Sequence, residues 1–205
     1  MSPVRAFIAL DIPAAIQRAI DEASADLRTK IGSLVRWVPV QNMHLTLKFL
    51  GDVPPASLDA LTATLLAEAD SCSSFDMGIG GLGLFPSSKR PRVIFIGIQA
   101  PAGFEALYRG IETACARLGY PPEARIFSPH LTIGRVRQYT SAADSQKIRH
   151  AIESSTIDSL GTARVDSVQL YKSDLKPDGA AYTRLISAPF HAVIASHEVA
   201  KQSPR

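Results

Sequence analysis

The tripeptide His-Leu-Thr occurs twice in this chain, at residues 44–46 and 130–132, which are 86 positions apart. The two surroundings read HLTLKFLG and HLTIGRV, apolar runs that are typical of β-strands. Only five of the 205 residues are histidine, so two matching tripeptides are not expected by chance. Residues i and i+2 of a strand share a face. Each copy therefore presents an imidazole and a hydroxyl side by side.

Other segments repeat at nearly the same spacing. An offset of 86 carries three residues onto similar ones: Leu82, Leu84 and Phe85 onto Val168, Leu170 and Tyr171. An offset of 88 aligns VRAFIAL with RVIFIGI, and an amphipathic helix is expected after each. The order strand, helix, His-Leu-Thr strand, helix, strand is thus found twice. We predict a duplicated α+β unit whose pseudo-two-fold axis brings His44 and His130 to a shared cleft.

Hydrophobic periodicity defines the expected elements. Strands are predicted at residues 4–10, 34–38, 44–50, 93–98, 130–136, 165–171 and 181–187. Helices are predicted from Pro13 to Ile31, after a Ser57 cap, over 104–118 and over 143–155. The glycines of the apolar stretch 75–85 match a dinucleotide-binding pattern, but a basic turn follows instead of a helix, so we reject such a site.

Composition indicates a folded protein with a substantial core. Hydrophobic residues make up 46% of the chain and charged residues 20%. No apolar run approaches the roughly 20 residues that span a membrane, and the N-terminus reads as a strand rather than a signal peptide. Cys72 and Cys115 lack a CxxC or secreted spacing, so we expect reduced, packed thiols and a cytoplasmic location. We expect residues 1–190 to form one bilobal domain, and 191–205 a partly disordered tail.

The distribution of charged residues is compatible with a phosphate-bearing substrate but does not identify one. The net charge is only +3, although basic residues cluster near Arg92 and at Arg135 and Arg137. Counted from His130, an ideal strand directs Arg135 away from the face of Thr132, unless a β-bulge turns it back. A phosphate contact by Arg135 therefore depends on such a bulge.

Two opposed histidines suit general acid–base cleavage of a phosphodiester. An imidazole titrates near about 6.5, so at neutral pH one ring can accept a proton from water while the other donates to the leaving oxygen. Thr46 and Thr132 can donate hydrogen bonds to the non-bridging oxygens. Neither motif has a second ligand at a suitable spacing, so we expect no metal and no cofactor.

These motifs resemble those of the 2H phosphoesterases, and within them the bacterial and archaeal RNA 2′,3′-cyclic phosphodiesterases, historically called 2′-5′ RNA ligases. The resemblance extends to about Phe190 and rests on FIALDIP, RWVP, NMHLTLKFLG, GLGLFPS, RPRVIFIG, SPHLTIGRV and VQLYKS. The doubled His-x-Thr-x motif in this order is highly specific. Only the tail, with His191 and His197, has no counterpart in the family.

The resemblance implies a bilobal fold, with an antiparallel sheet flanked by helices in each lobe and the site between them. It implies metal-independent hydrolysis of a terminal RNA 2′,3′-cyclic phosphate to a 2′-phosphate; some members also join RNA ends in reverse. His44 then matches the proton donor to the 3′ oxygen and His130 the base that activates water. Thr46 and Thr132 match the phosphate-contacting hydroxyls.

Further expectations concern the substrate and the alternatives. Phe127 and Tyr171 could stack on a base, although core packing is the commoner role of such aromatics. We expect a monomer that acts on RNA and does not bind membranes. The alternatives are a hydrolase of small nucleoside cyclic phosphates and an RNA-binding module with little catalysis.

Overall fold

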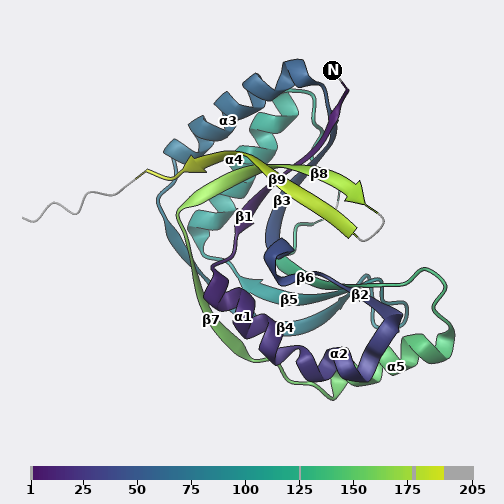
Figure 1. Ribbon diagram of the computed structural model, residues 1–205. Coiled ribbons are helices and arrows are strands. Elements are labelled where there is room, and N and C mark those ends of the chain that lie inside the picture. The colour runs from purple at the N-terminus through teal and green to yellow at the C-terminus, as the bar shows by residue number, and fades with distance from the viewer. Residues whose placement is uncertain (1, 125, 177–178, 192–205) are drawn as a thin grey trace, which may run out of the picture.

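The computed structural model describes residues 2–124, 126–176 and 179–191, which form two antiparallel sheets facing each other (Figure 1). The first sheet has the order β3-β1-β8-β9, with β1 Val4–Asp11, β3 His44–Val53, β8 Ser167–Lys176 and β9 Gly179–Pro189. The second has the order β2-β6-β5-β4-β7, with β2 Val35–Trp37, β4 Phe75–Phe85, β5 Val93–Gln99, β6 His130–Val136 and β7 Ser159–Val165.

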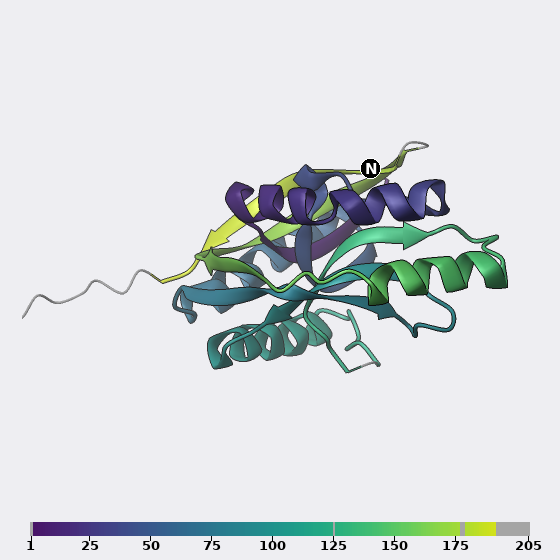
Figure 2. The ribbon, with the colours of Figure 1, turned by 90° about the horizontal axis from the view of Figure 1, so that it is seen from below.

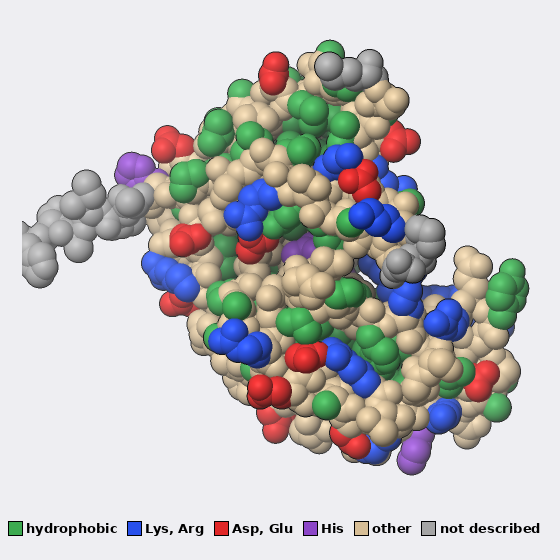
Figure 3. All heavy atoms as spheres, in the orientation of Figure 1, with side chains coloured by type: hydrophobic (Ala, Val, Ile, Leu, Met, Phe, Trp, Pro, Cys, Tyr) green, Lys and Arg blue, Asp and Glu red, His purple; other side chains and the backbone are tan. Residues whose placement is uncertain are grey.

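Helices cover the outer face of each sheet. On the first sheet lie α3 (Leu58–Asp70) and α4 (Ala102–Arg117), which also pack against each other. On the side of the second sheet, α1 (Ala14–Ala23) contacts β7, and α2 (Ala25–Ile31) contacts α5 (Ala142–Glu153). The view from below shows α1 and α2 running end to end, with α5 beside α2 (Figure 2). The helices thus take the outer faces, the inner faces of the two sheets face each other, and the space-filling view shows a hollow between the two lobes (Figure 3).

The strand pairing confirms the predicted duplication and the α+β class. Strands β3-β1-β8 of the first sheet correspond to β6-β5-β4 of the second. His44 lies opposite Asp11, and His130 lies opposite Gly97, so the offset of 86 holds for both partners. The offset of 88 suggested for these first strands is therefore wrong. A slip of two residues keeps every side chain on its face, so periodicity alone could not detect it.

The second sheet carries one strand more than the first. The short strand β2 pairs with β6 on the edge away from β5. Gly134 of β6 makes this possible, because a Cβ there would lie 2.6 Å from Val35 Cγ1. Among the described residues, the first sheet has no strand in the corresponding place beside β3. The two lobes are thus related by topology but differ along one edge.

Most of the predicted elements are present, but the structure differs from the prediction in several places. The helix expected from Pro13 to Ile31 is divided at Ser24, whose buried hydroxyl donates to the Ile20 carbonyl at 2.7 Å, a bond that competes with regular helix geometry. Strand β3 does not end before Gly51 but continues to Val53. Two strands are not among the predicted ones: β4, which the Gly-rich stretch 75–85 forms, and the edge strand β7, whose SLGTARV sequence has few apolar residues.

The helix ends and cysteines complete the comparison. Ser57 precedes α3 but its side chain makes no capping hydrogen bond, whereas Ser141 forms a full capping box with Asp144 at the start of α5. Cys72 and Cys115 are free and buried, as expected. Burial raises the pKa of both thiols, that of Cys115 to about 11. Both thiols are therefore poor nucleophiles.

Part of the predicted tail lies outside the described residues. His191 still belongs to the fold, because its backbone N–H donates to the Cys72 carbonyl at 2.9 Å. Residues 192–205, including His197, are not described. Within the described part of the chain, no helix combines the length and apolar character needed to cross a membrane.

Candidate active site

The two predicted histidines are held by the same kind of hydrogen bond to the backbone. His44 begins β3, and its Nδ1 lies 2.8 Å from the Asn42 carbonyl oxygen. His130 begins β6, and its Nδ1 lies 2.7 Å from the Ser128 carbonyl oxygen. Each ring is therefore anchored to the backbone two residues before it, in equivalent positions of the two sheets.

This anchor fixes which nitrogen is available for chemistry. A carbonyl oxygen only accepts hydrogen bonds, so Nδ1 must carry the proton and donate it. The neutral ring is then a base at Nε2, and the charged ring is an acid at the same atom. Both histidines thus offer Nε2 for proton transfer.

Each threonine shares the face of its histidine, as predicted. Along both strands His and Thr are half-buried and the leucine between them is buried. Strands β3 and β6 contact each other where the two sheets meet. The two strands that carry His44 and Thr46, and His130 and Thr132, thus lie next to each other.

A β-bulge decides the position of Arg135. The pairing of β5 with β6 skips Ile133, so Ile133 and Gly134 are both buried and Arg135 is exposed. The extra residue turns Arg135 onto the face of Thr132, the exception that the sequence left open. The matching bulge in β3 turns Phe49 onto the face of Thr46, with 59% of its surface exposed. Equivalent places thus hold a cation in one lobe and an aromatic ring in the other.

Aromatic rings surround His44. The Phe7 ring stacks on His44 with centroids 4.8 Å apart, and Tyr182 meets His44 edge-on at 5.1 Å. Tyr171, predicted as a stacking residue, lies 6.3 Å from His44 and stacks on Phe7 at 5.4 Å. Packing against these rings leaves the imidazole little freedom to turn.

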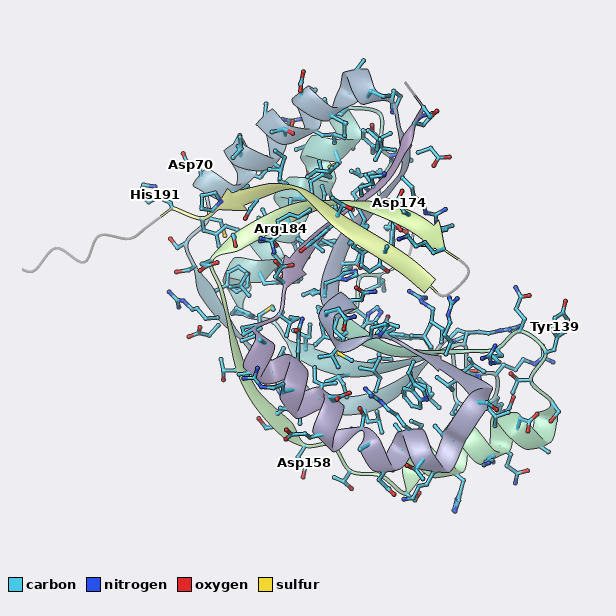
Figure 4. All side chains as sticks on the ribbon, viewed as in Figure 1. Asp70, Tyr139, Asp158, Asp174, Arg184 and His191 are labelled. Carbon is cyan, nitrogen blue, oxygen red and sulfur yellow. The ribbon has the colours of Figure 1, made fainter. Side chains whose placement is uncertain are left out.

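A charged network lies at the edge of this aromatic cluster. The Tyr171 hydroxyl donates to Asp11 at 2.6 Å, and Arg184 donates to the other Asp11 oxygen at 2.8 Å. Arg184 is labelled on β9 in Figure 4. Asp11 is the strand neighbour of His44, whereas His130 has Gly97 in the equivalent place. At this ladder position, the first lobe therefore places a carboxylate beside its histidine and the second lobe does not.

The surroundings of His130 are aromatic. Phe85 and Phe95 meet the His130 ring edge-on at 4.9 and 5.5 Å. Phe85 corresponds to Tyr171 in the duplication, because Phe85 pairs with Val93 just as Tyr171 pairs with Phe7. The sequence repeat had already matched Phe85 with Tyr171, so this signal could have identified Phe85 as part of the site.

Phe127 lies elsewhere. Its ring stacks on Tyr108 of α4 at 4.1 Å and on Phe104 at 5.8 Å. This is the core-packing role that we considered the commoner one. The structure thus separates the two predicted stacking residues: Tyr171 is beside a histidine and Phe127 packs against a helix.

The environment of His44 lowers its pKa. Burial is the main cause, because it disfavours the charged ring, and the positive charge of Arg135 acts in the same direction. The hydrogen bond to Asn42 and the negative charge of Asp11 oppose the shift without cancelling it. His44 of the free protein is therefore mainly neutral at pH 7.

Charge changes next to His44 should move this pKa in opposite directions. Asp11→Asn removes the negative charge that favours the imidazolium, so the pKa of His44 should fall further. Arg135→Gln removes a positive charge, so the pKa should rise. Histidine NMR titrations of the free protein measure both, with the exposed His150 as internal control. If both substitutions moved the pKa of His44 in the same direction, or if neither moved it, the placement of Asp11 and Arg135 beside His44 would be contradicted.

The described residues hold no group of three His, Cys, Asp or Glu side chains that could bind a metal ion. The groups that the site does offer are two imidazoles, two hydroxyls, a guanidinium and several aromatic rings. Such a set can transfer protons, bind an anion and stack on planar rings.

The sequence profile of the LigT-like phosphoesterases matches residues 10–95 and again 96–182, once for each half of the duplication. The chain belongs to this phosphoesterase family. A Methanothermobacter thermautotrophicus protein named RNA 2′,3′-cyclic phosphodiesterase is 31% identical over 88% of this chain and 95% of its own. A Thermotoga maritima protein of the same name is 31% identical, and the match covers 91% of this chain and 96% of that protein.

Solved structures of LigT-like phosphoesterases share the fold. The protein TT0787 of Thermus thermophilus superposes with a TM-score of 0.78 at 27% identity, over 92% of this chain and 99% of its own. E. coli LigT in its apo form gives a TM-score of 0.69 at 26% identity, over 94% and 100%. E. coli LigT has also been solved with 3′-AMP and with phosphate. The bilobal, duplicated architecture is thus that of LigT-like phosphoesterases.

Proposed function

We propose that this protein hydrolyses the terminal 2′,3′-cyclic phosphate of RNA to a 2′-phosphate, using His44 and His130 as a general acid–base pair. The observation that carries the proposal is the pair of equivalent His-x-Thr strands, each with its imidazole anchored through Nδ1. The names of the relatives support the same substrate.

In this mechanism the two rings act on opposite sides of phosphorus. Nε2 of His130 takes a proton from water as its oxygen attacks phosphorus. The bond from phosphorus to the 3′ oxygen breaks, and Nε2 of His44 gives its proton to that oxygen. The 2′ oxygen keeps the phosphate. The two-fold relation of the lobes suits an in-line displacement, because the attacking and leaving oxygens lie on opposite sides.

The anionic phosphate is bound by groups that surround it from both lobes. The hydroxyls of Thr46 and Thr132 donate to the non-bridging oxygens, and Arg135 supplies a positive charge. Tyr171 or the exposed Phe49 can stack on the terminal base.

The substrate itself completes the protonation of His44. The pKa of this ring is lowered in the free protein, first by burial and also by Arg135. A phosphodiester anion in the cleft offsets the charge of Arg135 and favours the imidazolium of His44. Asp11 acts in the same direction from the other side. The acid is thus formed where the anion binds, while His130, with Gly97 in place of a carboxylate neighbour, takes the role of base.

The same groups can catalyse attack on the cyclic phosphate by an RNA 5′-hydroxyl in place of water. His130 then accepts the hydroxyl proton, the 5′ oxygen bonds to phosphorus, and His44 protonates the departing 3′ oxygen. The product is a 2′-5′ linkage. Ligation therefore needs no further residue, only a second RNA end in the cleft.

Turnover of an RNA oligonucleotide with a 2′,3′-cyclic phosphate end, measured beside 2′,3′-cyclic AMP and with EDTA present, tests the proposal. We expect a 2′-phosphate product, undiminished rates in EDTA and a bell-shaped dependence of kcat/KM on pH. Preference for cyclic AMP would favour a hydrolase of small cyclic phosphates. RNA binding without turnover would favour a binding module, and a 3′-phosphate product would contradict the assigned donor.

A further inference from the structure

An open groove lies along the second sheet, next to the cleft. Its lining includes Arg36, Arg92, Arg135, Gln138 and Tyr139. Its volume is about 640 Å³, which is within the range of about 300–1,000 Å³ that small-molecule sites span. Three of these five side chains are guanidinium groups, and we call the feature the tri-arginine groove.

Neighbouring chain segments bring the three arginines together. Arg36 of β2 lies directly opposite Arg135 of β6 in the strand ladder, so both side chains project from the same face. Arg92 immediately precedes β5, and its carbonyl accepts from the Val136 N–H at 2.9 Å. The cluster is therefore fixed by backbone pairing rather than by loops.

The arrangement carries an electrostatic cost that the protein itself does not relieve. Like charges directly opposite each other destabilise a sheet. In residues 2–124, 126–176 and 179–191, none of the three arginines has a carboxylate within 4.0 Å, whereas Arg164 pairs with Asp76 and Arg184 with Asp11. The structure gives Arg92 only a 3.5 Å contact with the Gln138 carbonyl. Three converging, uncompensated guanidiniums make a site for anions.

The groove is continuous with the candidate active site. The bulge in β6 puts Arg135 on the face of Thr132, and the same arginine lines the groove and lowers the pKa of His44. In the space-filling view, Lys and Arg side chains gather at the right-hand opening of the hollow between the lobes (Figure 3). A chain that leaves the cleft past Arg135 therefore enters the groove.

The other lobe lacks the equivalent elements within the described residues. Arg135 corresponds to Phe49 there, and the strand that carries Arg36 has no counterpart beside β3. The tri-arginine groove thus lies on one side of the pseudo-two-fold axis. This asymmetry gives the cleft a direction, which a long substrate needs and a cyclic mononucleotide does not.

We propose that the tri-arginine groove binds the phosphodiester backbone of the RNA strand on the 5′ side of the cyclic phosphate. The inference deepens the proposed function and rests on it. Arg135 contacts the reacting end, and Arg36 and Arg92 bind the linkages that precede it. Tyr139, labelled in Figure 4, lies at the tip of the second lobe and lines the groove with 99% of its surface exposed. An upstream base can stack on its ring. The groove makes the enzyme prefer RNA ends over cyclic mononucleotides.

The double variant Arg36→Gln/Arg92→Gln tests this preference. For a short single-stranded RNA ending in 2′,3′-cyclic phosphate, kcat/KM should fall by about tenfold or more, through KM. Hydrolysis of 2′,3′-cyclic AMP should stay within about twofold of the parent protein. The logarithm of the RNA association constant falls linearly with the logarithm of the salt concentration, with a slope of about −0.7 for each phosphate contact to a single strand. Loss of two contacts should therefore make this slope less steep by about 1.4. Parallel losses on both substrates, or no loss on either, would overturn the proposal.

A control and a binding assay separate this proposal from the proposed function. Arg117→Gln changes an exposed arginine at the end of α4 in the other lobe and should leave both substrates unaffected. Fluorescence anisotropy with a 3′-phosphorylated RNA measures binding without turnover. Weaker binding by the double variant supports the groove even if neither cyclic substrate is hydrolysed. Unchanged RNA binding, or stronger competition by a polyglutamate peptide than by RNA, contradicts it.

Discussion

Replacement of His44 or of His130 by alanine is expected to lower kcat/KM for a cyclic-phosphate RNA by about 100- to 10,000-fold, the usual contribution of a positioned acid or base. Each variant loses the Nε2 that its backbone-anchored ring presents. Because both rings act in one displacement, the double variant should be little worse than either single one. Steady-state kinetics on the three variants measure this.

His150→Ala provides the matched control, because His150 is an exposed histidine on α5, away from the cleft. It should retain full activity. Circular dichroism and RNA binding should be close to those of the parent protein for all four variants, since both active-site histidines are only half-buried. If His44→Ala or His130→Ala kept near-parental hydrolysis with an intact fold, the paired mechanism would be wrong.

Breaking the buried ion pair between Lys48 and Glu112 should cause the largest loss of stability. Lys48 Nζ lies 2.9 Å from Glu112 Oε1 and also donates to the Pro121 carbonyl at 2.7 Å, with only 1% of its side chain exposed. Lys48→Met leaves the Glu112 carboxylate buried without its cation. Removing one partner of such a pair costs about 3–5 kcal/mol, or roughly 6–20 °C in Tm for a chain of this size.

A double-mutant cycle separates the pair from the packing around it. Lys48→Met/Glu112→Leu removes both charges and should recover much of the lost stability, although the Pro121 carbonyl and the Glu123 N–H lose their partners. Glu105→Gln, in an exposed pair on the same helix, should leave Tm nearly unchanged. Thermal melts of the parent protein, of Lys48→Met, of Glu112→Leu and of the double variant complete the cycle, with Glu105→Gln measured beside them. A double variant as unstable as the single one would contradict the account.

This ion pair also has a place in the architecture of the site. The bulge in β3 directs Lys48 inward, toward α4, instead of onto the cleft face. Through Glu112 and Pro121 it ties α4 to the segment that leads to His130. The equivalent position in the other lobe is Gly134, which leaves room for β2.

The doubled His-Leu-Thr motif was enough to predict the duplication and the shared face of each His and Thr. That success has a physical reason, because alternation along a strand is local and needs no knowledge of its partners. The helix over 104–118 could be predicted from the sequence as well, since apolar residues recur along one side of it. Strand β7 was missed because its few apolar residues give little alternation.

The sequence could not reveal the features that distinguish the two lobes. The position of Arg135 depends on a bulge at Ile133, which arises from pairing with β5 and has no local signature. Asp11 becomes a neighbour of His44 only through the register of β1 against β3. Phe127 and Tyr171 looked alike in sequence, and only tertiary packing separates them.

The most direct test of the account uses an RNA whose terminal cyclic phosphate has sulfur in place of the 3′ oxygen. A thiolate leaves without the help of a proton donor, so loss of the acid should matter little, whereas the attacking water still needs a base. His44→Ala should then hydrolyse this substrate within about tenfold of the parent protein, while His130→Ala remains at least about 100-fold slower. Rescue of His130→Ala instead, or of neither variant, would contradict the assignment of His44 as acid and His130 as base.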